Sequence, residues 1–311
     1  MEVSAHAIAQ RRTGNLFFDA LIFTNCSEDH LDYFETFEKY SSVKRSVFKS
    51  DRTDKMIVNA DDPLGRKIIE EEGVNVISYG IENPADAFAI IGKESDEGTE
   101  FILNLMDYVK RVKLKLVGEY NVYNALAALT CAAAVGVNAE IAAKAVEEVK
   151  PIAGRCEFLG RCRGGKIFLD YAHTPDGILK SLTSLKKVCK GKLICLFGCG
   201  GNREKEKRPK MGEISVSNAD FTVITDDNPR FEDPEEIRRE IESGAISAGG
   251  KYINIAGREK AIEYAISLLN SGDVLLLAGK GAEDYQEICG VKYPFSDRAI
   301  TEKIIDREEM K

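Results

Sequence analysis

Four short loops in the second half of the sequence carry residues that can bind a small charged molecule. They are DYAHTPD (170–176), GCGGNREKEKRP (198–209), DDNPRFEDP (226–234) and AGKGAEDYQ (278–286). The second loop joins glycines to basic side chains, a combination that favours a phosphate or a carboxylate. In the third loop Arg230 offers a planar fork to a carboxylate, while the neighbouring Asp and Asn side chains can bind an ammonium. The residues of the third loop therefore predict a site that binds both a carboxylate and an ammonium group of an amino acid.

The first two loops also have a simpler structural interpretation. Thr174 and Pro175 are typical of a helix N-cap followed by the first helical residue. The glycine loop is neither a GxGxxG motif, because Arg203 stands at the third glycine position, nor a Walker A loop, and its charges can be a solvated run. In the first half, His30 is a weak metal candidate, and Lys44 alone indicates nothing.

Short apolar runs must position these loops. Runs at 166–170, 193–197, 221–225, 251–255 and 273–278 predict strands, and amphipathic helices are expected at 176–190, 209–218, 234–247 and 257–271. Such alternation predicts βαβ units and a parallel sheet with helices on both faces. Ligands of these sheets bind beyond the carboxyl ends of the strands, where the four loops fall.

The pattern changes near Pro151, which predicts two domains, 1–150 and 151–311. In the first domain we expect strands at 21–25, 55–60, 74–80 and 86–92, and a hairpin of 101–106 with 108–118. Helices are expected at 35–50, 62–72, 121–135 and 138–149. Polar and apolar residues alternate from Met1 to Arg12, which predicts a strand end and a loop.

Composition excludes several classes of protein. The 311 residues carry a net charge of −8, which argues against a general binder of nucleic acids or of anionic membranes. No apolar run has the length of a membrane span and no signal peptide is visible, so we expect a cytoplasmic protein. The eight cysteines form no CxxC pair, which favours reduced, buried thiols and gives a zinc site little support.

Nine segments occur in the order found in one enzyme family. The chain resembles the Mur ligases, and within them the ligases that add the third residue of the peptidoglycan stem peptide. The resemblance runs from Met1 to about Asp297. Each segment alone is a modest signal, whereas the ordered set is highly specific. The segments are MEVSAHAIAQRR, TNCSEDHLDYF, YSSVK, GEYNVYN, GRCE, DYAHTPD, FGCGGNREKEKRP, DNPR and GKGAEDYQ.

The resemblance implies a fold and a reaction. It implies an α/β chain, with an incomplete central P-loop-type ATPase domain at 1–150 and a Rossmann-like, doubly wound C-terminal domain at 151–311. In the family, ATP phosphorylates a substrate carboxylate, and the incoming amine attacks the acyl phosphate to give an amide. The DNPR loop is the form associated with adding meso-diaminopimelate to UDP-MurNAc-L-Ala-D-Glu, whereas lysine-adding relatives carry a different loop.

The resemblance also implies roles for individual residues. Glu2, His30 and Lys44 would be catalytic and would hold Mg²⁺, with Lys44 carbamylated so that it supplies oxygen ligands. The muramoyl-dipeptide substrate would contact Ser4, Gln10 and Arg12. The nucleotide would contact Asn121, Asn124, Arg155, Asp170, Tyr171 and His173. The added amino acid would contact Arg203, Asp227, Asn228, Pro229, Arg230, Gly279 and Glu283.

Two departures from the family pattern affect these expectations. Ala282 stands where the family has a histidine. No G-x-x-x-x-G-K-[ST] motif occurs in the sequence, so we expect the 311 residues alone to be inactive in ligation. The alternatives are a lysine-adding or other Mur-type ligase, a non-catalytic amino-acid-binding relative, and a split enzyme in which a separate chain supplies the P-loop and the uridine-binding domain.

Overall fold

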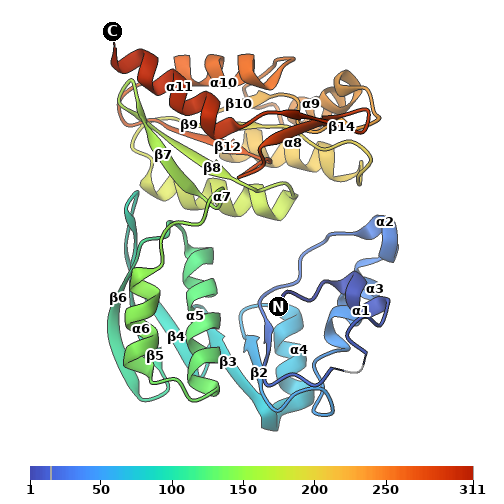
Figure 1. The fold of residues 1–311 in the computed structure, drawn as a ribbon, viewed down its shortest axis with the longest axis vertical. Coiled ribbons are helices and arrows are strands. Elements are labelled where there is room, and N and C mark those ends of the chain that lie inside the picture. The colour runs from blue at the N-terminus through green and yellow to red at the C-terminus, as the bar shows by residue number, and fades with distance from the viewer. Residues whose placement is uncertain (15, 311) are drawn as a thin grey trace. The chain divides into compact units, whose positions relative to one another are not determined.

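A computed structural model describes residues 1–14 and 16–310 of the chain (Figure 1). The chain forms two compact units. The first contains Met1–Lys115 and Glu119–Lys150, and the second contains Leu116–Gly118 and Pro151–Lys311. Each unit is built from one large sheet and its helices, so the predicted α/β class is confirmed.

The described part of the first unit has a six-stranded sheet in which β1 to β6 follow one another in sequence order. Strands β1 to β4 are parallel, whereas β4, β5 and β6 are antiparallel neighbours. The hairpin expected from the two apolar runs after residue 100 is confirmed. The strands are β1 (Leu21–Phe23), β2 (Met56–Asn59), β3 (Val76–Gly80), β4 (Ala87–Ser95), β5 (Gly98–Leu105) and β6 (Tyr108–Leu114).

Helices bury both faces of β2. Met56 and Val58 belong to a core cluster with Leu64 and Ile68 of α4 (Pro63–Glu72). Ile57 points to the opposite face and is also fully buried, which agrees with the contacts of α5 (Glu119–Ala134) with β2 to β5. The other helices of the unit are α1 (Ala5–Ala9), α2 (Leu31–Phe34), α3 (Phe37–Arg45) and α6 (Ala139–Glu148).

One carboxylate fastens the start of α5 to the end of β2. Asp61 accepts hydrogen bonds from the backbone N–H groups of Ile81, Glu82 and Asn83 at 2.6, 3.0 and 2.7 Å. The hydroxyl of Tyr123, in the GEYNVYN segment, also donates to Asp61, at 2.7 Å. Burial acts to raise the pKa of Asp61, but these hydrogen bonds outweigh it and lower the pKa below its usual value.

The strand end predicted for Met1–Arg12 is wrong, because this segment forms helix α1. The Ser4 hydroxyl accepts a hydrogen bond from the N–H of Ala7 at 3.2 Å and caps the helix. Ala5 is buried, and alanine has the highest intrinsic helix propensity of all residues. The cap and the propensity therefore outweigh the alternating pattern.

The second unit has a sheet in the order β11-β10-β9-β12-β8-β7. The first five strands in this order are parallel, as the sequence predicts, and only β7 is antiparallel to its neighbour β8. The strands are β7 (Glu157–Cys162), β8 (Gly165–Asp170), β9 (Leu193–Phe197), β10 (Phe221–Ile224), β11 (Tyr252–Asn254) and β12 (Val274–Ala278).

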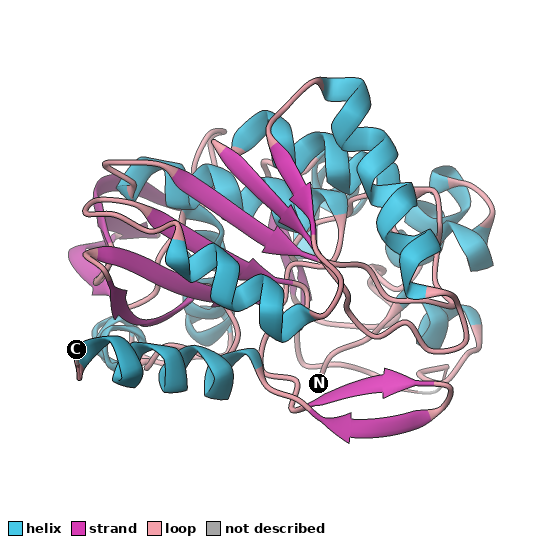
Figure 2. Ribbon diagram, turned by 90° about the horizontal axis from the view of Figure 1, so that it is seen from above, coloured by secondary structure: helices cyan, strands magenta, loops and turns pink. Residues whose placement is uncertain are grey.

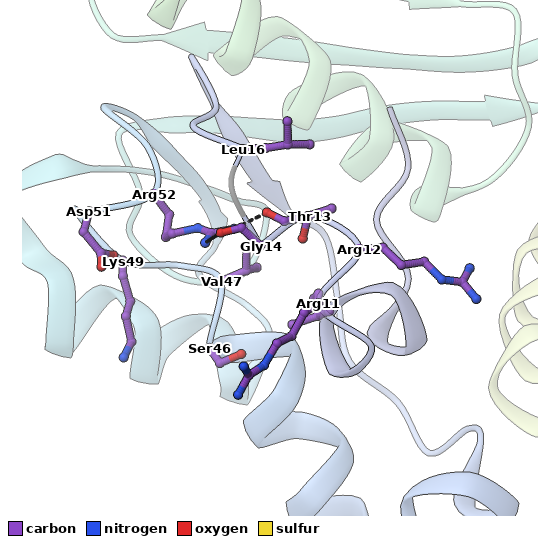
Figure 3. A pocket seen from close by; sticks show the side chains of 11 residues that line it. Arg11, Arg12, Thr13, Gly14, Leu16, Ser46, Val47, Lys49, Asp51 and Arg52 are labelled. Carbon is purple, nitrogen blue, oxygen red and sulfur yellow. Dashed lines mark hydrogen bonds between the residues drawn. The ribbon is translucent and has the colours of Figure 1, made fainter.

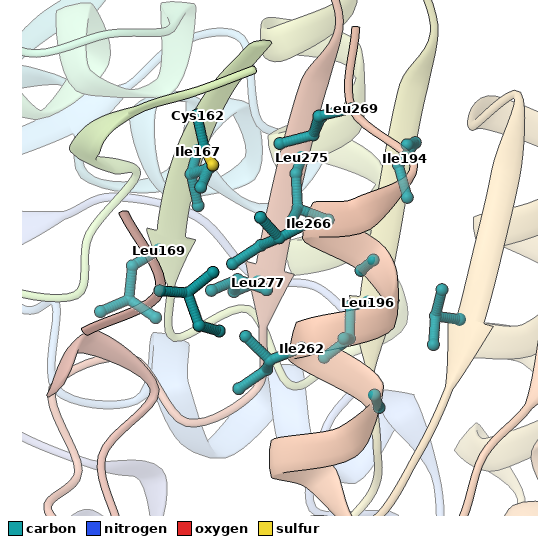
Figure 4. Packing of buried hydrophobic residues seen from close by; sticks show 14 residues of the cluster. Cys162, Ile167, Leu169, Ile194, Leu196, Ile262, Ile266, Leu269, Leu275 and Leu277 are labelled. Carbon is teal, nitrogen blue, oxygen red and sulfur yellow. The ribbon is translucent and has the colours of Figure 1, made fainter. Parts of the chain in front are cut away.

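Helices cover both faces of this sheet (Figure 2). On one face Ile194, Leu196 and Leu277 pack against Ile262 and Ile266 of α10 (Arg258–Ser267), as Figure 4 shows. On the other face Cys195 and Phe197 are equally buried. That face meets α7 (Pro175–Val188), α8 (Lys207–Asn218) and α9 (Pro234–Ala248), and the predicted Thr174 N-cap of α7 is confirmed.

Several elements of the second unit were not expected from the sequence. Strand β7 has no counterpart in the sequence prediction, and neither does the hairpin of β13 (Tyr285–Ile288) and β14 (Val291–Pro294), which begins at the end of the glycine-rich last loop. Helix α11 (Asp297–Glu309) was also missed, although Ser296 caps it. Ser296 followed by apolar residues at Ile300 and Ile304 is a helix signal that was available in the sequence.

The cysteines are free thiols. Cys156, Cys162, Cys195 and Cys199 are buried, and burial raises the pKa of Cys195 to about 12, whereas Cys289 is exposed. The expectation of buried thiols therefore holds for only part of the set. Among the described residues, no helix has the length and apolar character needed to cross a membrane.

Replacing Asp61 by Asn tests the anchor between β2 and α5. We expect D61N to lower the free energy of unfolding of the first unit by about 1–2 kcal/mol at pH 7, since charged hydrogen bonds are lost. Because the pKa of Asp61 is lowered in the fold, its contribution is present above the unfolded value of 3.8 and is lost as the pH falls. Hydrogen exchange of the first unit, compared with the exposed control D54N, measures both effects. Equal protection in the two variants would contradict the anchoring role.

Candidate amino-acid-binding site

The four chemistry-bearing loops lie at one edge of the second sheet. We call 170–176, 198–209, 226–234 and 278–286 the strand-end rim. They follow β8, β9, β10 and β12, whose parallel pairing places their carboxyl ends together. The N–H of Gly279 donates to the Asp170 carbonyl at 3.1 Å, and the N–H of Gly201 donates to the Asn228 carbonyl at 2.9 Å. The structure thus brings the four loops together, as the sequence predicts.

A buried guanidinium fixes the rim from inside the unit. Arg258 is fully buried and pairs with Asp297, with Nε–Oδ1 and Nη2–Oδ2 distances of 2.8 and 2.7 Å. Its Nη2 also donates to the Ala278 carbonyl at 2.8 Å, and its Nη1 donates to the Asp226 carbonyl at 3.3 Å. Arg258 therefore ties the ends of β10 and β12 to the first residue of α11.

Asp227 and Gly279 approach each other closely on the rim. A Cβ on Gly279 would lie 2.9 Å from Oδ2 of Asp227, and the φ of Gly279 is +106°. Both facts favour glycine at this position. Oδ1 of Asp227 accepts from the N–H of Asn228 at 2.6 Å, and Oδ2 lies 3.9 Å from Nη1 of Arg258. The chemistry of this carboxylate suits an ammonium.

Asn228 is largely engaged inside the protein. It is buried, and its Oδ1 accepts from Nζ of Lys280 and from the N–H of Glu287, both at 3.0 Å. Its Nδ2 donates to Oε2 of Glu283 at 2.9 Å. Lys280 is fully buried and lies 3.3 Å from the same Oε2. We infer that Asn228 and Lys280 orient Glu283, whose other carboxylate oxygen has no hydrogen bond within the described chain.

Arg230 lies on the rim with its guanidinium partly engaged. Nη1 donates to the Gly201 carbonyl at 2.7 Å, and Nε donates to Oε2 of Glu287 at 3.2 Å. Nη2 has no hydrogen-bond partner in the part of the chain that the structure describes. A Cβ on Gly200 would lie 2.8 Å from Nη1 of Arg230 and 3.9 Å from Cγ of Arg203. Two guanidinium side chains thus extend from the same part of the rim.

The basic cluster of 198–209 divides into internal and exposed residues. Arg208 is fully buried and binds Glu232 through Nη1 and Nη2, at 2.9 and 3.0 Å, and Glu240 through Nη1 at 2.6 Å. The Arg208 hydrogen bonds lower the pKa of Glu232 to about 2. Arg203, in contrast, is exposed, and within the described residues its guanidinium donates only to the Asn202 carbonyl, at 3.4 Å. Pro229 is buried, and its carbonyl accepts from the N–H of Glu232 at 3.0 Å.

The residues expected on the nucleotide side occur in both units. In the second unit the Arg155 guanidinium lies 5.0 Å from the ring centre of Tyr171, which lies 4.7 Å from the ring of His173. These three side chains form a cluster whose flat groups can contact a base. Asp170 is buried, accepts from the N–H of Ala172 at 3.0 Å, and has a pKa raised by burial. These contacts make Asp170 a brace for the loop.

In the first unit, Asn121 and Asn124 share one face at the start of α5, as their spacing predicts. Nδ2 of Asn124 donates to Oδ1 of Asn121 at 3.3 Å. Asn121 is buried and Asn124 is exposed. Their nucleotide role stays a prediction.

The candidate metal residues are only partly assembled. Nζ of Lys44 donates to the Asn25 carbonyl at 2.8 Å and lies 5.4 Å from the ring centre of Tyr40. The ring of His30 lies 6.1 Å from that of Tyr40, and Glu2 is exposed ahead of α1. Among the described residues, no group of three or more His, Cys, Asp or Glu side chains can hold a metal ion. The unmodified side chains therefore do not fit Mg²⁺, and the metal role stays a prediction.

A cavity of about 740 Å³ lies beside the expected muramoyl-contacting segment (Figure 3). Its lining includes Arg11, Arg12 and Lys49, and Figure 3 shows Arg11 and Arg12 extending in different directions. Ser4 caps α1, and the N–H of the exposed Gln10 donates to the His6 carbonyl at 2.9 Å. The structure thus uses Ser4 to shape the segment, and the contacts of these residues with a substrate stay predictions.

Sequence reasoning missed the residues that position the rim. Lys280, Arg258 and Asp297 are fully or almost fully buried, although their types are usually exposed. Glu287 was missed as well. Lys280 lies inside the glycine loop at 278–286, and this position is a weak signal of a functional role. Nothing in the sequence separates Arg258 from the other charges on its helix.

The same two-part organisation occurs in known proteins. Residues 1–132 match the Mur ligase middle domain, and residues 154–281 match the Mur ligase, glutamate ligase domain. Taken together, the fold and these matches define a pair of ligase domains. The chain belongs to the Mur ligase family.

Two relatives are named UDP-N-acetylmuramoyl-L-alanyl-D-glutamate--2,6-diaminopimelate ligase. The protein of Caldanaerobacter subterraneus subsp. tengcongensis is 40% identical over 99% of this chain and 64% of its own length. That of Bacillus velezensis is 39% identical over 98% of this chain and 63% of its own length. The chain thus spans less than two thirds of these relatives.

Solved structures agree with this assignment. One ligase structure of the same name has a TM-score of 0.64 and 31% identity, and the match covers 99% of this chain and 64% of that chain. A pseudomurein peptide ligase type C from Methanothermus fervidus has a TM-score of 0.75 with 22% identity. That match covers 97% of this chain and 66% of the other, and it shows the likeness of fold alone.

Replacing Glu232 by Gln tests the brace between Arg208 and the third loop. The pKa of Glu232 is about 2 in the fold and 4.5 without it, so its contribution is full above pH 4.5 and is lost between pH 4.5 and about 2. We expect E232Q to lower the free energy of unfolding by about 1–2 kcal/mol at pH 7. On acidification, E232Q should lose less stability than the wild type. Urea unfolding at several pH values measures this. The exposed control E235Q should change stability by less than about 0.5 kcal/mol, and an equal effect of both variants would contradict the brace.

Proposed function

We propose that this chain supplies the acceptor-amino-acid site of an ATP-dependent Mur ligase that adds meso-diaminopimelate to UDP-MurNAc-L-Ala-D-Glu. One observation carries this proposal. Arg230 lies on the same strand-end rim as the carboxylates of Asp227 and Glu283, and its Nη2 has no hydrogen bond within the described chain. The names of the two relatives support the same substrates.

The rim matches the charges of a diamino acid that has two carboxylates. Arg230, with Arg203 nearby, would bind the distal carboxylate through charge-assisted hydrogen bonds. Asp227 and Glu283 would bind an ammonium group. L-Lysine lacks the distal carboxylate and would leave the Arg230 guanidinium without its partner. A site that contains such a polar group discriminates more strongly than an apolar pocket.

The remaining roles belong to the same proposal. The cluster of Arg155, Tyr171 and His173 would contact the nucleotide of ATP. Mg²⁺ binding would require carbamylation of Lys44, and no step here depends on it. The sequence has no P-loop motif, so ligation would need a polypeptide that provides one. The reaction would take place in the cytoplasm, as expected from the composition.

Calorimetry with the purified chain tests the proposal. We expect meso-diaminopimelate to bind more tightly than L-lysine, and R230A to weaken diaminopimelate binding roughly 10- to 100-fold, since charged hydrogen bonds contribute about 1.5–3 kcal/mol. R239A is the matched control, because Arg239 forms an exposed ion pair with Glu235 on the surface of α9. Equal binding of the two amino acids, or an R230A variant that binds like the wild type, would contradict the proposed site.

A further inference from the structure

We propose that Glu287 is a positioning residue that decides which edge of the Arg230 guanidinium faces the ligand. This inference rests on the proposed function, because Arg230 is the residue assigned to the distal carboxylate. Glu287 lies in β13, on a hairpin outside the loop that carries Arg230. Neither the motifs in the sequence nor the similarity to known proteins gives it a role.

Glu287 contacts the Arg230 loop through both its backbone and its side chain. Its carbonyl accepts from the N–H of Arg230 at 3.0 Å, and its N–H donates to Oδ1 of Asn228 at 3.0 Å. Its Oε2 accepts from Nε of Arg230 at 3.2 Å. The N–H of Cys289 donates to the Arg230 carbonyl at 2.7 Å. The hairpin therefore holds Arg230 on its backbone and on its side chain.

The backbone of Arg230 needs this support. Its φ is 54°, in the left-handed region that a residue other than glycine seldom adopts without support. The hairpin in turn is closed by Cys289 and Gly290, with φ of 49° and 77°. Two successive positive φ values are those of the turn that matches the twist of paired strands. A well-formed hairpin thus presents Glu287 to a strained arginine.

The hydrogen-bond inventory of Arg230 shows what this contact selects. A guanidinium has five N–H donors, on Nε, Nη1 and Nη2. Nε is engaged by Glu287, and one Nη1 donor is engaged by the Gly201 carbonyl at 2.7 Å. The edge formed by Nε and Nη2 is therefore closed to a ligand carboxylate. The end formed by Nη1 and Nη2 keeps donors for it, since Arg230 makes no other hydrogen bond within the described residues.

Fixing this orientation would set the distance at which the distal carboxylate is recognised. Without Glu287 the guanidinium could rotate, and either of its edges could face the ligand. A displacement of about 1 Å at a binding group is enough to lower affinity or rate severely. A Gln at position 287 keeps an oxygen acceptor for Nε, whereas an Ala does not.

Calorimetry on variants of Glu287, alone and in the R230A background, tests this role. We expect E287A to raise the dissociation constant of meso-diaminopimelate roughly tenfold and to narrow its preference over L-lysine. E287Q should stay within about threefold of the wild type. E263A is the control, because Glu263 forms an exposed ion pair with Arg307 on another surface. In the R230A background, E287A should have little further effect, since the two residues act as a unit. Unfolding temperatures show whether each variant is folded.

A second measurement does not depend on the ligand. In ¹⁵N-labelled protein, the Nε–H resonance of Arg230 should exchange slowly with water, should be retained in E287Q and should be lost in E287A. If the wild type binds no diaminopimelate but this resonance depends on Glu287, the positioning holds and the ligand assignment fails. Retention of the resonance in E287A would overturn the inference. So would an E287A substitution that weakens diaminopimelate binding equally in the wild-type and R230A backgrounds.

Discussion

The candidate site depends on one buried ion pair, that between Arg258 and Asp297. Two fully buried charges are stable only when each is hydrogen-bonded, and removing one partner of such a pair typically costs about 3–5 kcal/mol. Arg258 meets this requirement by binding Asp297 and the carbonyls of Ala278 and Asp226, at the ends of β12 and β10. The same contacts that stabilise the charge therefore hold two loops of the strand-end rim in a fixed relation.

Close backbone packing completes this fixed frame. A Cβ on Gly201 would lie 1.9 Å from the carbonyl oxygen of Pro229, and one on Gly198 would lie 2.4 Å from that of Thr225. Because these loops are packed at such short range, charged side chains on them have few alternative positions. Arg208 and Lys280 are buried and used internally, whereas Arg203 is exposed and Arg230 and Glu283 are only partly buried. The frame thus separates residues that build the rim from residues that can bind a ligand.

The sequence predicted the parallel core and the meeting of the four loops, because apolar strands and strand-end glycines are local signals. The charge pattern alone could not separate Arg208 from Arg203, since both lie in one charged run and only the fold buries one of them. The strand predicted at Met1–Arg12 was wrong because the Ser4 cap outweighed the alternation. The contacts of Arg258 and Glu287 join residues distant in sequence, and no local pattern reveals such pairs.

The central claim is that the strand-end rim is a preformed site for an amino acid with a distal carboxylate. A crystal structure of the chain with meso-diaminopimelate tests it most directly. The account predicts one carboxylate within about 3 Å of Nη2 of Arg230, an ammonium beside Asp227 and Glu283, and an unchanged contact between Arg230 and Glu287. Diaminopimelate bound elsewhere, or bound with its carboxylate on Nε of Arg230, would contradict it.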